Sequence, residues 1–482
     1  MDLLENRIFR VELAPQQGMF SIFCHDPALP SLLNCRIRLE YYAGAKKHAR
    51  QVSAWRAVSP GSERITLPGQ GEVDLCQYDT APDENGISLH LDFGIVQEYP
   101  LVIWKATMFN QGNQPVAIDR LVMLDLQPGT GLIQFSQAVK PTDFGFFSNG
   151  WQSWSPAQWY PADGKMRTSR LGMLQLPMIK NAGTPYPHRR AEFSSDFFAV
   201  IGDRKTRTGF LVGFLAQKEQ FGSITCSFGS SPFLQMWANG DGARLDPQKK
   251  METDWAVFNP LLLDHRDPLD RYTEAVAREN GVSLAPETPL GWCSWYQYSD
   301  KVTPAEVRQN LNELVRSGDT LPVELVQIDD GFETQVGDWF SFKRTFSEGL
   351  KPLADEIRQQ GLLPGLWLAP FAVHPRSKLF KDHPDWILRN KKGKPVNAGF
   401  GWGSLFTGLD LTVPSAFDYV VSVVKTACTE WGFPYLKLDF LYAAALPGRY
   451  ADGTRTRAQV MRMGMQAIRE AVGPDVFILG CG

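Results

Sequence analysis

The chain contains the stretch Leu325-Val-Gln-Ile-Asp-Asp-Gly331, in which a short apolar run leads directly into two carboxylates. Such a run, bounded by turn signals, is typical of a strand that is buried on both faces of a parallel sheet. Taken alone, the Asp-Gly pair fits an ordinary turn as well as it fits a ligand contact. Because side chains at the carboxyl ends of parallel strands face the functional site of βα folds, we expect Asp329 and Asp330 to face a binding site.

Predicted strands and helices alternate on both sides of this stretch. The segment Thr303-Pro-Ala-Glu306 combines a capping box with a proline at the first helical position, which predicts a helix that ends near Gly318. Strands are predicted at 290–295, 323–328, 363–368, 435–438 and 476–479, and further helices around 350–360, 415–431 and 456–472. Repeated βα units of this length indicate a parallel sheet, either a (β/α)₈ barrel or a doubly wound sheet.

The first half of the chain has a different pattern, with short alternating apolar runs separated by glycine, proline and asparagine. Strands are predicted at 19–24, 87–93 (after the turn signal Asn85-Gly86), 101–104, 116–124 and 210–215. We therefore expect a multidomain β plus α/β protein, with a large N-terminal antiparallel β-sandwich followed by a partial (β/α)₈ barrel. The predicted domains are the sandwich at 1–263, a helical linker at 264–289 and the first part of the barrel, about five strands, at 290–482.

About five barrel strands are predicted before Gly482, whereas a closed barrel needs eight strands and typically ~250 residues. We therefore expect this chain to be a fragment that is truncated within the barrel.

Composition narrows the function classes. The 482 residues exceed what one hydrophobic core usually serves, and 49 Lys plus Arg against 52 Asp plus Glu give a net charge of −3, which argues against nucleic-acid or anionic-membrane partners. No Sec-type signal, membrane-length apolar run or C-x-x-C pair is present in the sequence, and the seven cysteines are scattered. We expect a cytoplasmic location. His374 and His383 do not fall at predicted strand ends, so no metal or cofactor is expected.

The predicted strand ends carry carboxylates, one ammonium group and large aromatic rings, without a glycine-rich phosphate loop or a Ser/His or Cys/His pairing. This combination favours a sugar, because aromatic rings stack on the apolar face of a pyranose while its hydroxyls need acceptors and a donor. The candidate residues are Trp292, Ser294, Trp295, Tyr296, Asp329, Asp330, Trp367, Lys437, Asp439 and Cys481.

Each candidate also has a purely structural interpretation. Lys437 and Asp439 lie on the same side of their strand, and a salt bridge between them in the barrel wall is the alternative to a catalytic role. Trp295 and Trp367 are compatible with core positions, and Cys481 with a small buried apolar residue.

Six segments of this sequence resemble the glycoside hydrolases of family 36, which include bacterial and plant α-galactosidases and raffinose-synthase relatives. They occur in the family's order: Gly291-Trp-Cys-Ser-Trp-Tyr296, Gln327-Ile-Asp-Asp330 with Gly337-Asp-Trp339, Pro364-Gly-Leu-Trp-Leu-Ala-Pro-Phe371, His383-Pro-Asp-Trp386, Lys437-Leu-Asp-Phe440 and Ile478-Leu-Gly-Cys-Gly482. In the sandwich half, Asn149-Gly-Trp-Gln-Ser-Trp-Ser-Pro156 is similar to a family segment that reaches over the barrel mouth.

The resemblance implies specific roles. Asp439 would be the nucleophile and Lys437 a hydroxyl contact, while Asp329 and Asp330 would hold the galactose hydroxyls on the O4 and O6 side. The residues implied to line the sugar pocket are Trp295, Trp367, Trp151 and Trp154, with Cys481 and Gly482 beside O2. The family's acid/base aspartate follows the Cys-Gly motif, so we expect it beyond Gly482.

The implied activity is the hydrolysis of terminal α-D-galactosides, of the melibiose and raffinose type, with retention through a covalent galactosyl-enzyme. Lysine two residues before the nucleophile would favour the charged form of that carboxylate. Two alternatives stay open: galactosyl transfer, as in raffinose or stachyose synthesis, and a non-catalytic galactoside-binding protein. The choice between galactose and N-acetylgalactosamine is also open, and a homo-oligomer is possible.

Overall fold

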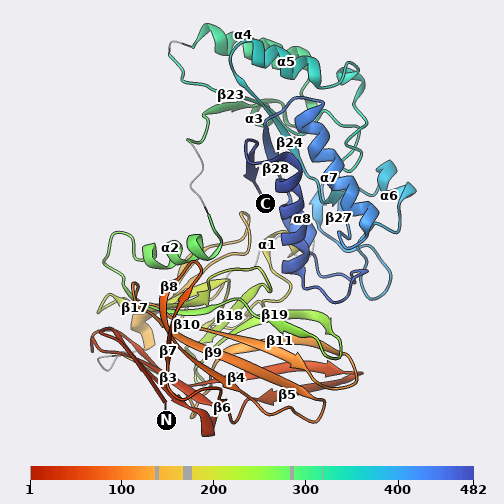
Figure 1. Cartoon of the computed structure of the whole chain (residues 1–482). Coiled ribbons are helices and arrows are strands. Elements are labelled where there is room, and N and C mark those ends of the chain that lie inside the picture. Colours follow the sequence, from red (N-terminus) through yellow and green to blue (C-terminus); the bar gives the residue numbers. More distant parts are fainter. Residues whose placement is uncertain (1, 136–140, 167–175, 283–286, 319) are drawn as a thin grey trace. The chain divides into compact units, whose positions relative to one another are not determined.

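The computed structural model describes residues 2–135, 141–166, 176–282, 287–318 and 320–482 (Figure 1). Contacts divide the chain into two units. The first comprises Met1–Arg170, Ile179–Ser283 and Gly453–Gln459, and the second comprises Leu171–Met178, Leu284–Asp452 and Val460–Gly482. The domain boundaries expected at 263 and 289 stay predictions, but helix α2 (Asp270–Glu279), expected in a linker, has its contacts within the first unit.

The first unit consists of two large antiparallel sheets. In the described residues the first sheet has ten strands: β1 (Asp2–Glu5), β2 (Phe9–Ala14), β3 (Met19–Cys24), β4 (Ser31–Ala43), β5 (Lys46–Gln51), β11 (Val116–Leu126), β12 (Leu132–Gln134), β15 (Glu192–Asp196), β18 (Gly222–Ser227) and β19 (Phe233–Leu245).

The second sheet has eleven strands over the same described ranges: β6 (Arg56–Ala57), β7 (Glu63–Leu67), β8 (Gly71–Asp79), β9 (Ile87–Val96), β10 (Val102–Asn110), β13 (Phe144–Ser148), β14 (Gln158–Pro161), β16 (Phe198–Asp203), β17 (Thr208–Phe214), β20 (Lys250–Glu252) and β21 (Ala256–Leu262).

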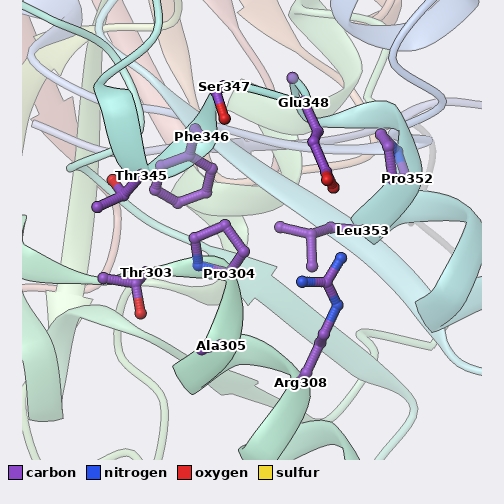
Figure 2. A pocket seen from close by; sticks show the side chains of 11 residues that line it. Thr303, Pro304, Ala305, Arg308, Thr345, Phe346, Ser347, Glu348, Pro352 and Leu353 are labelled. Carbon is purple, nitrogen blue, oxygen red and sulfur yellow. The ribbon is translucent and has the colours of Figure 1, made fainter.

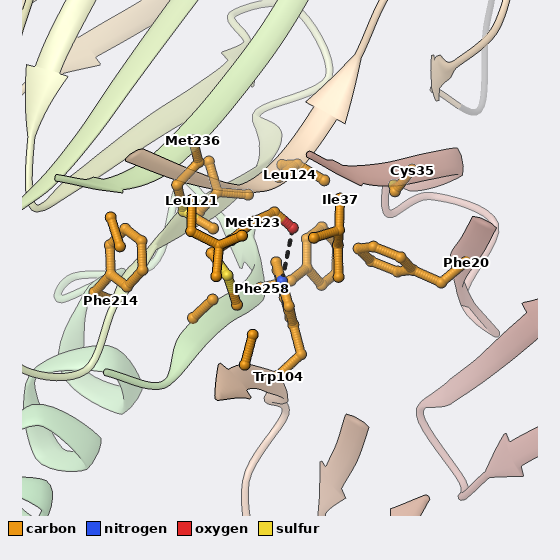
Figure 3. Close-up of a cluster of buried hydrophobic side chains, with 14 of the residues drawn as sticks. Phe20, Cys35, Ile37, Trp104, Leu121, Met123, Leu124, Phe214, Met236 and Phe258 are labelled. Atoms are coloured by element: carbon orange, nitrogen blue, oxygen red, sulfur yellow. Dashed lines mark hydrogen bonds between the residues drawn. The ribbon is translucent and has the colours of Figure 1, made fainter. Parts of the chain in front are cut away.

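The core of this sandwich follows from the period of two in the strands. In β2, for example, Phe9, Val11 and Leu13 are buried while the residues between them are partly exposed. Figure 3 shows the centre of the core, where the indole Nε1 of Trp104 donates a hydrogen bond to the carbonyl oxygen of Met123 at 2.8 Å. A tryptophan can be fully buried here because its polar N–H has a partner.

A second apolar cluster lies on the other face of the second sheet. It contains strand residues such as Leu211 and Val257, together with Tyr272 and Ala275 of α2. The Tyr272 hydroxyl donates to the carbonyl oxygen of Phe214 at 2.8 Å. Helix α2 therefore covers this sheet and is a packed part of the first unit.

The second unit is built on a parallel sheet of strands β22 (Gly291–Cys293), β23 (Leu325–Ile328), β24 (Leu363–Leu368), β28 (Tyr435–Leu438) and β29 (Phe477–Gly480), in that order. Its helices are α3 (Trp295–Tyr298), α4 (Pro304–Arg316), α5 (Lys351–Gln359), α6 (Lys378–Asp382) and α7 (Pro414–Thr429), while α8 (Arg457–Val472) begins in the first unit and α1 (Leu176–Ile179) ends there. The strand order follows the chain order without reversal, which is the arrangement of a (β/α)₈ barrel and not of a doubly wound sheet. The expected fold class is confirmed.

Local signals explain much of this unit. Thr303 caps α4, with the reciprocal capping box to Glu306 and proline at the first turn, as predicted. The strand predicted at 290–295 is too long, because Ser294 has helical dihedral angles and Trp295 begins α3. A three-stranded antiparallel sheet of β25 (Ala372–Val373), β26 (Gly399–Gly401) and β27 (Ser404–Gly408) was not predicted.

None of the helices in the described ranges has the length and apolar character that crossing a lipid bilayer requires.

Candidate active site

Asp439 occupies the carboxyl end of β28. Its backbone N–H donates to the carbonyl oxygen of Leu368 at 2.8 Å, which continues the pairing of β28 with β24. The carboxyl Oδ2 accepts a hydrogen bond from Trp367 Nε1 at 3.1 Å, and Oδ1 accepts one from the backbone N–H of Phe440 at 2.8 Å. The Cys481 thiol is also hydrogen-bonded to this carboxylate. Donors thus surround an acceptor-only group, which fixes its orientation.

The backbone on either side of Asp439 is tightly constrained. Phe440 has a φ of +53°, a left-handed conformation that costs a non-glycine residue about 1 kcal/mol or more. Its ring packs against Trp402 and Phe406, with centroid distances of 4.9 and 5.4 Å. Gly482 has a φ of +78°, and a Cβ there would lie 3.0 Å from Asp439 Oδ1. Glycine lets the backbone after β29 approach the carboxylate.

The buried Asp329 and the partly buried Lys437 form an ion pair, with 2.8 Å between Lys437 Nζ and Asp329 Oδ2. The same oxygen accepts a hydrogen bond from Gln327 Nε2 at 2.6 Å, and the thiol of Cys293 lies 3.3 Å from it. Burial alone would lower the pKa of Lys437, but the Asp329 carboxylate outweighs it and the pKa is raised. The alternative considered from the sequence, a salt bridge between Lys437 and Asp439, is therefore not the ion pair found, because the ammonium group pairs with Asp329, which follows β23.

Asp330 points into a second carboxyl cluster. Its Oδ2 accepts a hydrogen bond from Trp402 Nε1 at 2.6 Å, and its side chain is hydrogen-bonded to Glu333. Trp402 lies in the two-residue turn between β26 and β27, where it and Gly403 both have positive φ, +51° and +72°. Both angles are those of a type I′ hairpin turn, which directs the indole toward Asp330.

The two predicted stacking tryptophans differ in environment. Trp367 is buried, packs edge-on against Trp339 at a centroid distance of 5.8 Å and donates to Asp439. Trp295 lies on α3 with 40% of its surface exposed, so it is not a core residue. An exposed indole at a strand end is available to a ligand, whereas Trp367 orients the carboxylate.

Trp151 and Trp154 belong to the first unit. Trp151 is buried and packs edge-on against Phe221, with centroids 6.1 Å apart, whereas Trp154 is 41% exposed. Contact of either residue with a sugar stays a prediction, and Trp154 is the better candidate because its ring is accessible.

The histidines near the site have structural partners. His374 is buried, and its Nδ1 lies 2.7 Å from Gln335 Nε2, while His383 stacks on Trp386 with centroids 3.8 Å apart. Within the described residues, no group of three or more His, Cys, Asp and Glu side chains could hold a metal ion.

A cavity of about 340 Å³ in the second unit lies away from these residues (Figure 2). The first turns of α4 and α5 line it, together with Phe346 and Glu348. Arg308 at its wall forms a two-pronged ion pair with Glu356, at 2.7 and 2.8 Å. None of the predicted site residues lines this cavity.

Comparison with known proteins supports the assignment to a family. The family model described as Melibiase matches residues 305–468. The chain is 27% identical over 240 residues to α-galactosidase AgaA of Geobacillus stearothermophilus, and 29% identical over 305 residues to an α-galactosidase of Escherichia coli. The structure of TtGalA, an α-galactosidase from Thermus thermophilus, in complex with p-nitrophenyl α-D-galactopyranoside superposes with a TM-score of 0.58 at 27% identity, covering 87% of this chain and 71% of that one.

Residues 305–468 are thus similar to the melibiase family, and the chain as a whole is similar to α-galactosidases. The matched regions cover 47% and 56% of this chain but only 30% and 42% of the Geobacillus and Escherichia enzymes. The chain therefore spans less than half the length of these two curated relatives.

The structure brings the predicted residues of strands β23, β24 and β28 together with Cys481 and Gly482, and it adds three that sequence reasoning missed. Gln327, Glu333 and Trp402 each hydrogen-bond to one of the two strand-end aspartates. Gln327 could have been found, because it lies two residues before Asp329 on the same side of the strand. No local signal marks Trp402, which is 72 residues from Asp330.

Proposed function

We propose that this protein hydrolyses terminal non-reducing α-D-galactosides with retention of configuration, and that Asp439 is its nucleophile. The observation that carries the proposal is the geometry of Asp439, at a strand end in the sheet, with Trp367 Nε1 on one oxygen and the Phe440 N–H on the other. A carboxylate held in a fixed orientation is what attack on an anomeric carbon requires. The names of the relatives, α-galactosidases, support the choice of reaction.

In the first step, Asp439 attacks the anomeric carbon, the glycosidic bond breaks, and the leaving oxygen takes a proton from a general acid. This gives a covalent galactosyl ester of Asp439. In the second step, water deprotonated by the same acid/base group attacks the ester and releases galactose with its original configuration. The general acid is assigned to none of the described residues.

The remaining residues would bind the sugar. Asp329, kept charged by Lys437, and Asp330 accept hydrogen bonds from galactose hydroxyls, while Lys437 donates. Cys481 and Gly482 would lie beside the hydroxyl next to the anomeric carbon, since both approach Asp439. Trp295, Trp367 and Trp154 would supply aromatic surface around the ring, with Trp151 supporting the loop that carries Trp154.

The proposed substrates are oligosaccharides with a terminal α-galactose, such as melibiose and the raffinose series. TtGalA has been solved with p-nitrophenyl α-D-galactopyranoside and with stachyose, which supports this class. Galactosyl transfer would follow the same first step, with a sugar in place of water in the second. The expected cytoplasmic location and a homo-oligomeric state stay predictions.

The test uses the whole protein and an activated α-galactosyl donor whose leaving group needs no protonation, so that only the nucleophile is assayed. A fluorine-substituted donor that slows the second step should trap a covalent adduct, and peptide mass spectrometry should place it on Asp439. Labelling of Asp329 or Asp330 would overturn the nucleophile assignment. No adduct and no galactose binding would overturn the proposed function.

Product analysis then separates the alternatives. Incubation with raffinose should release free galactose. Accumulation of longer galactosides in the presence of sucrose would instead favour transfer, and tight galactoside binding without turnover would favour a binding protein.

A further inference from the structure

Glu333 is a buried carboxyl group beside Asp330 that the mechanism above does not use. Both side chains are almost fully inaccessible, with 3% and 4% of their surface exposed, and they are hydrogen-bonded to each other. An ionised carboxylate can only accept hydrogen bonds. A hydrogen bond between two carboxyl groups therefore requires a proton on one of them.

The described residues around the pair supply donors but no direct counter-ion. Trp402 Nε1 donates to Asp330 Oδ2 at 2.6 Å, and the Gly331 N–H lies 3.4 Å from Glu333 Oε2. The cation that influences both groups is Lys343, whose Nζ donates to the carbonyl oxygen of Asp300 at 2.8 Å. The neighbouring Asp329 already has Lys437 as its partner.

Two negative charges cannot be accommodated in such a place without compensation. Burial raises the pKa of Glu333 well above its ordinary value, and the charge of Asp330 raises it further. Burial also raises the pKa of Asp330, against the hydrogen bonds from Glu333 and Trp402. Both effects favour a pair that keeps a proton and carries one negative charge rather than two.

Resting on the proposed function, we propose that Glu333 is a positioning residue of the galactoside site: it shares one proton with Asp330 and so holds that carboxyl against the Trp402 indole, in the orientation that receives sugar hydroxyls. The loop after β23 presents Asp330 and Glu333 three residues apart, and the β26–β27 hairpin delivers the indole from the other side.

The sharing of a proton makes sugar binding sensitive to pH in a way that a purely structural residue would not. When the shared proton leaves at alkaline pH, two buried like charges repel each other and the hydroxyl acceptor is displaced, so KM rises. The charged groups that influence the pair are Asp329, Lys343 and, through Asp329, Lys437.

The first test compares Glu333→Gln with the wild type in the whole protein. Glutamine keeps the shape and can donate an N–H to Asp330, but it cannot share a proton. With an activated aryl α-galactoside, we expect KM to rise about tenfold with little change in kcat. The alkaline rise of KM seen in the wild type should disappear. Glu348→Gln, which alters an exposed carboxylate outside the site, is the matched control and should behave as wild type.

The second test does not depend on turnover. Infrared difference spectroscopy on protein with isotope-labelled carboxyl groups should detect a protonated carboxyl band at neutral pH, and Glu333→Gln should abolish it. Should that variant not fold, Asp330→Asn must at least shift this band, because the partner is removed.

The outcomes are separable. If the wild type cleaves α-galactosides but Glu333→Gln keeps its KM and its alkaline rise, or if the protonated band is absent, the inference is overturned while the proposed function stands. If the wild type neither binds nor cleaves α-galactosides, the proposed function fails and this inference fails with it.

Discussion

The indole Nε1 of Trp367 donates a hydrogen bond to Asp439 Oδ2 at 3.1 Å, across the neighbouring strands β24 and β28. Trp367 is thus tied to the carboxylate that we propose as the nucleophile, and its ring is buried against Trp339. The sequence predicts that Trp367 stacks on the sugar, but its best-defined contact in the structure is this hydrogen bond to Asp439.

Replacing Trp367 by phenylalanine removes this donor and keeps an aromatic ring. A hydrogen bond to a charged group contributes about 1.5–3 kcal/mol, so we expect kcat/KM to fall about ten- to a hundredfold. Steady-state kinetics on an aryl α-galactoside would measure this. Trp339→Phe is the matched control, since Trp339 is equally buried and its Nε1 has no hydrogen-bond partner among the described residues. Equal losses in the two variants would show that packing, and not the hydrogen bond, matters.

Replacing Asp439 by glycine should abolish turnover while galactose affinity is largely kept, because Asp329, Asp330 and Lys437 remain. Azide should then restore cleavage of an activated aryl α-galactoside and give the β-galactosyl azide, since the small anion attacks once from the place of the carboxylate. Product identification by NMR provides the measurement. An azide product of the α configuration, or none, would contradict the role assigned to Asp439.

Replacing Lys437 by methionine leaves the buried Asp329 carboxylate without its counter-ion. Breaking a buried pair in this way costs about 3–5 kcal/mol, which urea unfolding should reveal. The double variant Lys437→Met with Asp329→Asn should recover part of the loss. Lys351→Met, which breaks an exposed pair with Asp355, should have a much smaller effect. A Lys437→Met protein as stable as wild type would show that the pair is solvated.

Replacing Trp154 by alanine should raise KM by an amount equivalent to about 1–2 kcal/mol, with an unchanged melting temperature, if its exposed ring contacts the sugar. Trp151→Ala should instead lower the melting temperature, because Trp151 is buried against Phe221. Parallel calorimetry and kinetics on both variants separate the two roles. An unchanged KM in Trp154→Ala would remove this loop from the proposed site.

His90 gives the first unit a pH-dependent stability. Asp92 and Asp79 outweigh partial burial and raise the pKa of His90 to about 9, above the unfolded value of about 6.5. The stabilisation is thus complete below about pH 6.5 and is lost as the pH rises toward 9. Urea unfolding should show His90→Gln less stable than wild type at about pH 6 and equally stable at about pH 10. The difference at about pH 6 should be less than 1 kcal/mol because the site is partly exposed. The exposed His188→Gln should show no such change.

The elements that could be predicted are those with local signals. The α4 capping box lies within four consecutive residues, and β24 and β28 were predicted with their observed bounds, because their apolar runs are short and interrupted by clear breaks. The strand-end rule then identified Asp329, Asp330, Lys437 and Asp439 as neighbours. The sheet order, which follows the chain, places these residues as a barrel requires.

The contacts that could not be predicted are between residues far apart in sequence. Lys437 could pair with a carboxylate on its own strand or with one on another strand. Its ion pair with Asp329 depends on the arrangement of the strands in the sheet, which the sequence pattern does not give. The hairpin that carries Trp402 has a Trp-Gly turn in place of the usual Asn-Gly turn. The sequence pattern therefore did not predict its left-handed backbone conformation. The helical turn that begins at Ser294 was likewise not predicted, because the apolar residues around it indicated a strand.

The packing of α2 also has a practical consequence for cutting the chain. Ending a recombinant first unit at residue 263 would remove Tyr272 and Ala275, uncovering the apolar face that includes Leu211 and Val257. A bare patch of this kind promotes aggregation. A boundary placed after Glu279 retains the helix, so protease or expression boundaries for the β-sandwich belong on the far side of α2.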